Sequence, residues 1–332
     1  MKQHLQPTRL FLVITLCLLT NSLWAQTPLA DMPQAPASPK GIQGIWIWRF
    51  DTIADPIKRQ ELLDFCQSQH INRLLVQMHM TKGNDQLRDA AALTALITQA
   101  ADRNIAVEAL EGDPAMAEKA NQPNTLKRLE VILAFNQTLP DGKKMVGLHY
   151  DIEPYILPQW KKGGDTRLAI MRNLLDFAHL ARKQLIAQQP PMTLSFDIPF
   201  WYDHKVSDKD NCILTYNDQT KNFYQHILDV SDYIGIMSYR TKAQGSNGVL
   251  KHVQSELDYA RKIGKTIVPA LETIELKSSP TITFFGKPAS EFWIEHNKVR
   301  QALADDPAFG GMFTHSYRGL KDLTIQPNTE KE

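Results

Sequence analysis

The stretch MVGLHYDI at residues 145–152 is a short run of apolar and aromatic residues between polar segments. Such a run predicts a buried β-strand. Similar runs recur along the chain at 44–50, 71–78, 104–110, 192–198, 232–238, 266–272 and 310–316. Because these runs alternate with amphipathic segments, the pattern is typical of βα units and a parallel sheet.

Helices are expected between the strands because apolar residues recur there at spacings of three and four. The main helical segments are 59–68, 85–101, 125–135, 166–187 and 252–263. No glycine-rich phosphate loop follows the first strand, which disfavours a dinucleotide-binding, doubly wound sheet. Eight strands instead predict an α/β fold of the TIM-barrel type, a closed (β/α)8 barrel in one domain at 41–323 with a C-terminal tail at 324–332.

The N-terminal segment has the pattern of a secretory signal peptide. Lys2 and Arg9 precede an apolar run at 10–19, and Ala25 is a suitable cleavage position. The apolar run is about half the roughly 20 residues that a membrane-spanning helix needs, so we expect no stable membrane span. Residues 26–40 are proline-rich and predict a linker. The product is therefore expected to be secreted or periplasmic.

Charge and cysteine content narrow the possible partners. Cleavage after residue 25 would leave 35 basic and 36 acidic residues, which gives no electrostatic reason to expect nucleic-acid binding. Cys66 and Cys212 would remain, too few for a disulfide scaffold. They either form one disulfide or are separate thiols, with Cys66 in a helical apolar pattern that suits a core residue.

The predicted fourth strand carries the residues that suggest chemistry. Alternate residues of a strand share a face, so His149, Asp151 and Glu153 should point into the barrel and toward its C-terminal mouth. Two crowded carboxyl groups tend to separate into one with a raised pKa and one that keeps its charge. Alternatively, these side chains complete a buried ion network with nearby arginines, for which the candidates are Arg49, Arg73 and Arg240.

The segment HYDIE at 149–153 resembles the end of the strand-four motif Asp-x-x-Asp-x-Asp-x-Glu of chitinase-type glycoside hydrolases of family 18. MSYR at 237–240 is similar to the Met-x-Tyr-Asp of their sixth strand. The resemblance implies that Glu153 is the general acid, that Asp151 orients the acetamido group of the substrate, and that Tyr239 binds the acetamido oxygen. The sugar's own acetamido oxygen is then the nucleophile.

The chain departs from this family pattern at several positions. Two of the strand-four acids are replaced by Val146 and His149, and Arg240 stands where an acid follows the tyrosine. The eighth strand ends in His315 and Tyr317 where the family has tryptophan. A barrel that binds carbohydrate without cleaving it would show similar departures, so this non-enzymatic function is kept as an alternative.

A second glycosidase mechanism starts from the same glutamate. IEP at 152–154 and PALE at 269–272 resemble retaining glycosidases that use a Glu-Pro on strand four and a nucleophilic glutamate at the end of strand seven. Glu272 would be this nucleophile, although Ile152 stands where these enzymes have asparagine. Alternatively, Glu272 or Glu275 is a solvated loop acid.

Aromatic and polar residues cluster at the predicted strand ends. Aromatic rings cover the apolar faces of sugars and polar neighbours bind their hydroxyl groups, so the set predicts a cleft for an oligo- or polysaccharide, with core packing as the alternative for each ring. The predicted substrate-binding residues are Trp46, Trp48, Gln77, His79, His149, Asp197, Trp201, Tyr202, Met237, His315 and Tyr317.

A metal-dependent hydrolase is the remaining alternative. Histidine and carboxylate side chains near the predicted mouth are suitable ligand types. However, the first strand offers Trp46 and Trp48 and no His-x-His pair. We therefore expect no metal and no cofactor. The residues considered as metal ligands are His79, His149, Asp151, Glu153 and His315.

Overall fold

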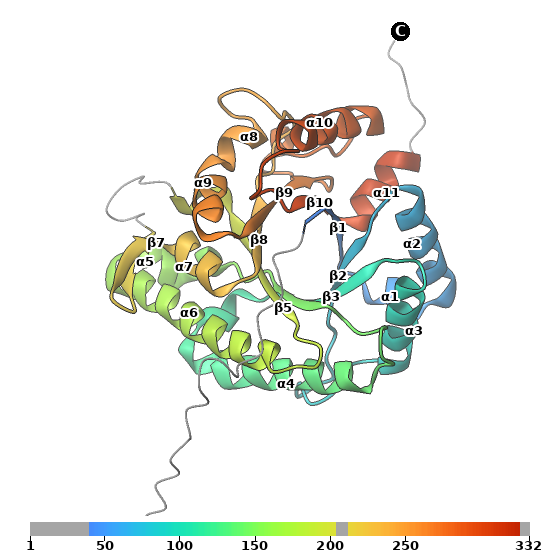
Figure 1. Ribbon diagram of the computed structural model, residues 1–332, viewed down its shortest axis with the longest axis horizontal. Coiled ribbons are helices and arrows are strands. Elements are labelled where there is room, and N and C mark those ends of the chain that lie inside the picture. Colours follow the sequence, from blue (N-terminus) through green and yellow to red (C-terminus); the bar gives the residue numbers. More distant parts are fainter. Residues whose placement is uncertain (1–39, 204–211, 326–332) are drawn as a thin grey trace, which may run out of the picture. The chain divides into compact units, whose positions relative to one another are not determined.

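The computed structural model describes residues 40–203 and 212–325, and these form a closed barrel of parallel strands enclosed by helices (Figure 1). Within them the barrel has eight strands in the order β1-β10-β9-β8-β5-β4-β3-β2. The predicted (β/α)8 fold is confirmed. The barrel strands are β1 (Ile42–Ile47), β2 (Arg73–Gln77), β3 (Ala106–Glu111), β4 (Gly147–Tyr150), β5 (Thr193–Pro199), β8 (Tyr233–Met237), β9 (Thr266–Glu272) and β10 (Gly311–His315).

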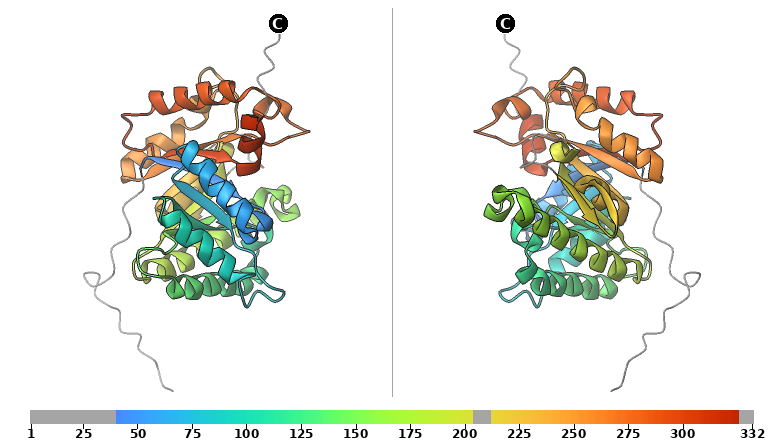
Figure 2. Two further views of the ribbon diagram at one scale, coloured as in Figure 1. Left: turned by 90° about the vertical axis from the view of Figure 1, so that its right-hand side faces the viewer. Right: turned by 90° about the vertical axis from the view of Figure 1, so that its left-hand side faces the viewer.

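Helices cover the outside of the barrel, as the side views show (Figure 2). Local sequence fixes several of their ends. Asp55 precedes Pro56, the first residue of α2, and its carboxylate accepts hydrogen bonds from the backbone N–H groups of Ile57 and Lys58. The longer helices are α2 (Pro56–Ser68), α3 (Ala90–Ala101), α4 (Gln122–Thr138), α6 (Gly164–Ile186), α7 (Phe223–Val230), α9 (Gln254–Ile263), α10 (Ala289–Ala302) and α11 (Tyr317–Ile325), and the short ones are α1 (Phe50–Ala54), α5 (Pro158–Lys162) and α8 (Val249–His252).

The boundaries differ from the prediction at both ends of the chain. The first strand was predicted at 44–50 but spans 42–47, because Phe50 and Asp51 already belong to the first turn of α1. The tail predicted from residue 324 begins inside α11, and its remainder from residue 326 lies outside the described residues. The predicted signal peptide and all of the linker except Lys40 also lie outside them.

Two apolar layers stabilise the barrel. The larger lies between the strands and the surrounding helices, and the smaller fills the barrel interior, where Trp46, Tyr233 and Phe313 are fully buried. Gly44 makes room for this interior layer, because a Cβ atom there would lie 2.3 Å from the ring of Phe313. The interior is therefore a packed core.

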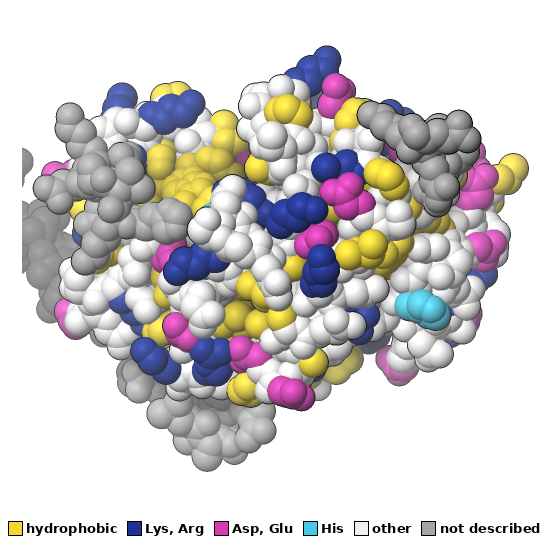
Figure 3. Space-filling model, turned by 90° about the horizontal axis from the view of Figure 1, so that it is seen from above, with side chains coloured by type: hydrophobic (Ala, Val, Ile, Leu, Met, Phe, Trp, Pro, Cys, Tyr) yellow, Lys and Arg dark blue, Asp and Glu magenta, His cyan; other side chains and the backbone are white. Residues whose placement is uncertain are grey.

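A two-stranded hairpin lies outside the barrel, formed by β6 (Ile213–Tyr216) and β7 (Gln219–Asn222). On the face shown in Figure 3, basic and acidic side chains are interspersed, without a large region of one sign. In the two described ranges, no helix combines the length and the hydropathy needed to cross a membrane.

Candidate active site

Asp151 and Glu153 lie directly after β4, at the C-terminal mouth of the barrel. The strand ends at Tyr150, and the backbone N–H of Asp151 still donates to the carbonyl of Glu111, at 2.8 Å. Pro154 begins a short 3-10 helix and disfavours a helical backbone at the residue before it, and Glu153 is accordingly non-helical, with φ −101° and ψ 73°. Both acids are therefore held at the point where barrel enzymes place reactive groups.

The surroundings of these acids favour their protonated forms. Burial raises the pKa of Asp151 well above its usual range, and the charges of Asp197 and Glu153 raise it further. The Oδ1 atom of Asp151 is buried without a hydrogen-bond partner. Burial also raises the pKa of Glu153, and a hydrogen bond from Tyr155 opposes this increase. A carboxylic acid that keeps its proton near neutral pH is suited to general acid catalysis.

Asp197 of β5 lies behind the two acids. Its Oδ2 atom accepts a hydrogen bond from the indole of Trp46 at 3.1 Å and lies 2.7 Å from Nε2 of His149. All three side chains are almost fully buried. Gly235 on the neighbouring β8 makes this position possible, because a Cβ atom there would lie 2.1 Å from Oδ1 of Asp197.

A chain of polar side chains continues from His149 through the barrel interior. Nδ1 of His149 is 2.7 Å from the Ser195 hydroxyl, and Ser195 donates to Glu108 at 3.2 Å. Tyr233 also donates to Glu108, at 2.8 Å, and Arg73 forms an ion pair with the same carboxylate. These contacts give Glu108 three partners and fix the ring of His149 beneath the acids.

Tyr239 follows β8 and is half-buried beside the acids. Its pKa is raised well above the usual value, first by burial and then by the negative charges of Glu272, Asp151, Asp197 and Glu153. The phenol therefore remains neutral and lies within electrostatic range of all four carboxyl groups. Met237, the last residue of β8, is nearly buried.

Glu272, the last residue of β9, is buried and its carboxylate is fully engaged. Its Oε1 atom accepts hydrogen bonds from the backbone N–H groups of Thr273, at 2.7 Å, and Ile274, at 2.8 Å. Both carboxylate oxygens also contact Nδ1 of His315, at 3.0 and 2.9 Å. Nε2 of His315 in turn accepts a hydrogen bond from the indole of Trp48 at 2.8 Å.

Several residues predicted to bind substrate are buried instead. Trp46, His149, Asp197 and Tyr202 are at most 4% exposed, because they pack inside the barrel or among the aromatic residues behind β5. Trp46 nevertheless lines the pocket described below, whereas His149, Asp197 and Tyr202 do not. Tyr317 is also buried, and its ring packs against Phe65 of α2.

The other predicted residues remain partly accessible near the strand ends. Gln77 ends β2, and His79 packs against Phe50, with its pKa lowered by burial. Trp201 packs against Tyr155 at a ring distance of 5.2 Å. Trp48 lies at the mouth of the barrel.

The alternatives that involve arginines, metals and cysteines can be compared with the geometry. Among the described residues, Arg49 pairs with Asp51, Arg73 with Glu108, and Arg240 hydrogen-bonds Asn247, so the predicted network with Asp151 and Glu153 is absent there. No group of three or more His, Cys, Asp or Glu side chains in these residues has an arrangement that could hold a metal ion. Cys66 and Cys212 are separate buried thiols.

Sequence analysis missed three residues of this site. Ser195 lies two residues before Asp197 on β5, so the alternation used for β4 would have found it. Glu108 follows from the same alternation on β3. Tyr155 comes directly after the Glu-Pro pair, but only the fold of the short helix brings its hydroxyl to Glu153.

Comparison with known proteins gives no match among protein-family models or curated sequences. The strand order defines the fold of the molecule, a closed (β/α)8 barrel. In fold, it is a divergent barrel like those of family 18 chitinases, as the following solved structures show.

A family 18 chitinase from Cycas revoluta, solved with allosamidin, has a TM-score of 0.56 at 10% identity and covers 84% of this chain and 96% of its own. A chitinase from Bacteroides thetaiotaomicron has a TM-score of 0.51 at 13% identity, with 86% and 91% covered. A β-mannanase from the blue mussel Mytilus edulis has a TM-score of 0.52 at 10% identity, with 88% and 93% covered. At these identities the similarity extends to the fold alone.

Proposed function

We propose that this protein is a glycosidase that cleaves an N-acetylated saccharide, with Glu153 as general acid. The observation that carries the proposal is the pair of acids after β4, Asp151 and Glu153, whose pKa values are both raised by burial. Tyr239 lies within electrostatic range of both. The fold similarity to chitinases agrees with this assignment.

Each residue has a distinct task in this mechanism. The acetamido oxygen of the substrate attacks the anomeric carbon, the glycosidic bond breaks, and Glu153 gives its proton to the departing oxygen. Asp151 accepts the acetamido N–H at its unpartnered Oδ1 atom, while Tyr239 donates to the acetamido oxygen before it attacks. Water then opens the ring, and the Glu153 carboxylate takes up its proton.

Glu153→Gln tests the central assignment. The amide keeps the size of the side chain but has no acidic proton, so hydrolysis of an N-acetylglucosaminide should fall on the order of 100-fold. Glu130→Gln, on the exposed face of α4, is the matched control and should keep wild-type activity. Wild-type rates in Glu153→Gln would remove Glu153 from the mechanism.

The two-glutamate mechanism would need Glu272 as nucleophile and would not need an acetamido group on the substrate. Both oxygens of Glu272 are engaged by backbone N–H groups or by His315, which argues against a role as nucleophile. We therefore expect wild-type protein to require the acetamido group and Glu272→Gln to be mild. Efficient cleavage of a plain glucoside, lost in Glu272→Gln, would overturn this choice. Binding of saccharides without cleavage would support the non-catalytic alternative.

Export is also part of the proposal, because a polymeric saccharide substrate would lie outside the cytoplasm. The support is the N-terminal sequence pattern, which lies outside the described residues. Intact mass of secreted or periplasmic material should show a mature chain that begins near Gln26. A full-length chain retained in the cytoplasm would contradict it.

A further inference from the structure

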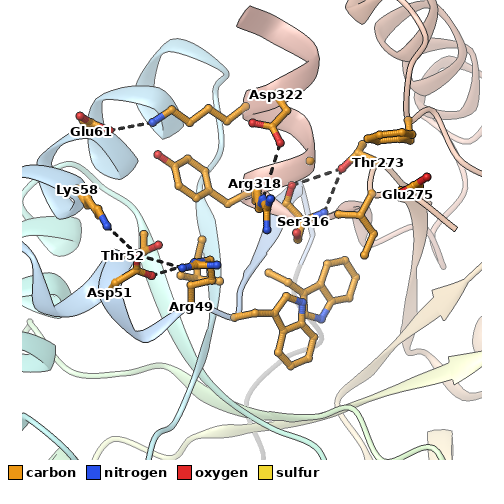
Figure 4. A pocket seen from close by; sticks show the side chains of 18 residues that line it. Arg49, Asp51, Thr52, Lys58, Glu61, Thr273, Glu275, Ser316, Arg318 and Asp322 are labelled. Atoms are coloured by element: carbon orange, nitrogen blue, oxygen red, sulfur yellow. Dashed lines mark hydrogen bonds and ion pairs between the residues drawn. The ribbon is translucent and has the colours of Figure 1, made fainter.

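A pocket of about 880 Å³ opens beside the candidate active site, between the segments that follow β1, β9 and β10 (Figure 4). Asp151, Glu153 and Tyr239 do not line it, so it is separate from the two acids. It is nevertheless adjacent to them. His315, which interacts electrostatically with Glu153, accepts a hydrogen bond from the indole of Trp48 in the pocket wall.

Trp48 is fixed in this wall by a chain of hydrogen bonds. Glu272 is held by two backbone N–H groups and receives the Nδ1 proton of His315, which leaves Nε2 of His315 free to accept from Trp48. Glu272 and His315 are also register partners on β9 and β10. A ring held in this way loses little conformational entropy when it binds a flat ligand face.

The remainder of the lining suits a neutral polyhydroxylated ring. Phe285, on the segment between β9 and α10, is 48% exposed and adds a second aromatic surface. Figure 4 shows polar side chains around the space, among them Arg49, Ser316 and Arg318.

The charges of the lining compensate one another. Arg49 and Lys58 both pair with Asp51, and Lys321 pairs with Glu61. A compensated lining has no net attraction for an ion, whereas apolar rings beside hydrogen-bonding groups match the faces and hydroxyls of a sugar.

We infer that this pocket is a second sugar subsite, which binds a further unit of the saccharide cleaved at Glu153. The inference rests on the proposed function and deepens it, because it makes the substrate an oligosaccharide that extends from the acids across Trp48. In this arrangement Trp48 and Phe285 contact the added sugar, and Glu272 and His315 are positioning residues that act through Trp48.

The first experiment measures how binding depends on substrate length. Calorimetry with Glu153→Gln, in which turnover is slowed on the order of 100-fold, should show tighter binding of β-1,4-linked N-acetylglucosamine oligomers as they lengthen from two to four units. Phe285→Ala should remove most of this gain, about ten-fold in Kd. Ile294→Ala, a similarly exposed apolar residue on α10 (54%), is the control and should keep it.

The second experiment tests the positioning role. Glu272→Gln keeps an acceptor oxygen for His315 and should retain the length-dependent gain, whereas Glu272→Leu should lose it. In the active background, Glu272→Leu should raise KM for the tetramer more than it lowers kcat for a short aryl glycoside. Equal effects on both substrates would show that Glu272 supports only the general fold.

The subsite and the proposed function can fail separately. Length-dependent binding that requires Phe285, without any hydrolysis, would support the subsite and contradict the glycosidase assignment. Hydrolysis with equal affinity for two and four units would overturn the subsite, as would the same loss in Ile294→Ala or no binding of any oligomer.

Discussion

Gly235→Ala should disrupt the centre of the barrel, although the residue has no side chain of its own. The added Cβ atom would lie 2.1 Å from Oδ1 of Asp197, whereas such contacts are practically never shorter than 3.0 Å. The Asp197 carboxylate must therefore move by about 1 Å in a close-packed interior, and it loses its contacts with His149 and Trp46 at 2.7 and 3.1 Å.

Leaving a buried carboxylate without its hydrogen-bond partners costs about 1–3 kcal/mol, and more when the carboxylate is charged. We expect Gly235→Ala to lower the free energy of unfolding by about 3 kcal/mol, a fall in Tm of roughly 6 °C for a domain of this size. The assay is urea and thermal unfolding of four proteins: wild type, Gly235→Ala, Asp197→Ala and the double variant. Because the clash disappears with the carboxylate, Gly235→Ala should cost little once Asp197 is alanine. Additive losses, or a stable single variant, would refute the reasoning.

Two further substitutions test buried acids, one through the pH dependence of activity and the other through stability. Tyr155→Phe removes the hydrogen bond that opposes the raised pKa of Glu153. The alkaline limb of the kcat/KM profile, where the acid loses its proton, should therefore move to higher pH. An unchanged limb would show that Tyr155 does not influence the pKa of Glu153. Glu256→Gln should stabilise the protein by about 1–2 kcal/mol at pH 7, because both oxygens of this buried acid lack a hydrogen-bond partner. Burial raises the pKa of Glu256, so the wild-type fold loses stability as pH rises above the usual glutamate range, and urea unfolding should show the advantage of Gln shrinking toward pH 4. An equal advantage at both pH values would contradict this explanation.

The barrel was predictable because its strands are buried on both faces. Strands such as β2 and β8 are continuous apolar runs, and these stand out against the amphipathic helices. The β6–β7 hairpin was missed, since its strands are short and largely polar. Its turn is formed by Asn217 and Asp218, which both have positive φ, at 48° and 60°. These residue types are typical of a two-residue hairpin turn and are visible in the sequence.

The candidate site was predictable only where one strand carries it. Alternation along a strand places His149 in line with Asp151 and Glu153, and it needs no knowledge of the neighbours. The role of Glu272 depends instead on the register between β9 and β10, which brings it opposite His315. No local pattern in the sequence contains that register, so the contacts from which we propose a positioning role for Glu272 could not be predicted.

The unpartnered oxygen of Asp151 gives a physical reason to expect a ligand with an N–H group at this site. Glu108, deeper in the barrel, has three polar partners in Arg73, Ser195 and Tyr233. Asp151 lies at the mouth with Oδ1 buried and unpaired, which costs about 1–3 kcal/mol. A donor from a bound molecule would recover this cost, and an N-acetyl group offers one beside a carbonyl oxygen that Tyr239 can bind. A sugar that carries only hydroxyl groups offers no such fixed N–H and carbonyl pair, so we expect the site to distinguish N-acetylated sugars from plain ones through Asp151 and Tyr239.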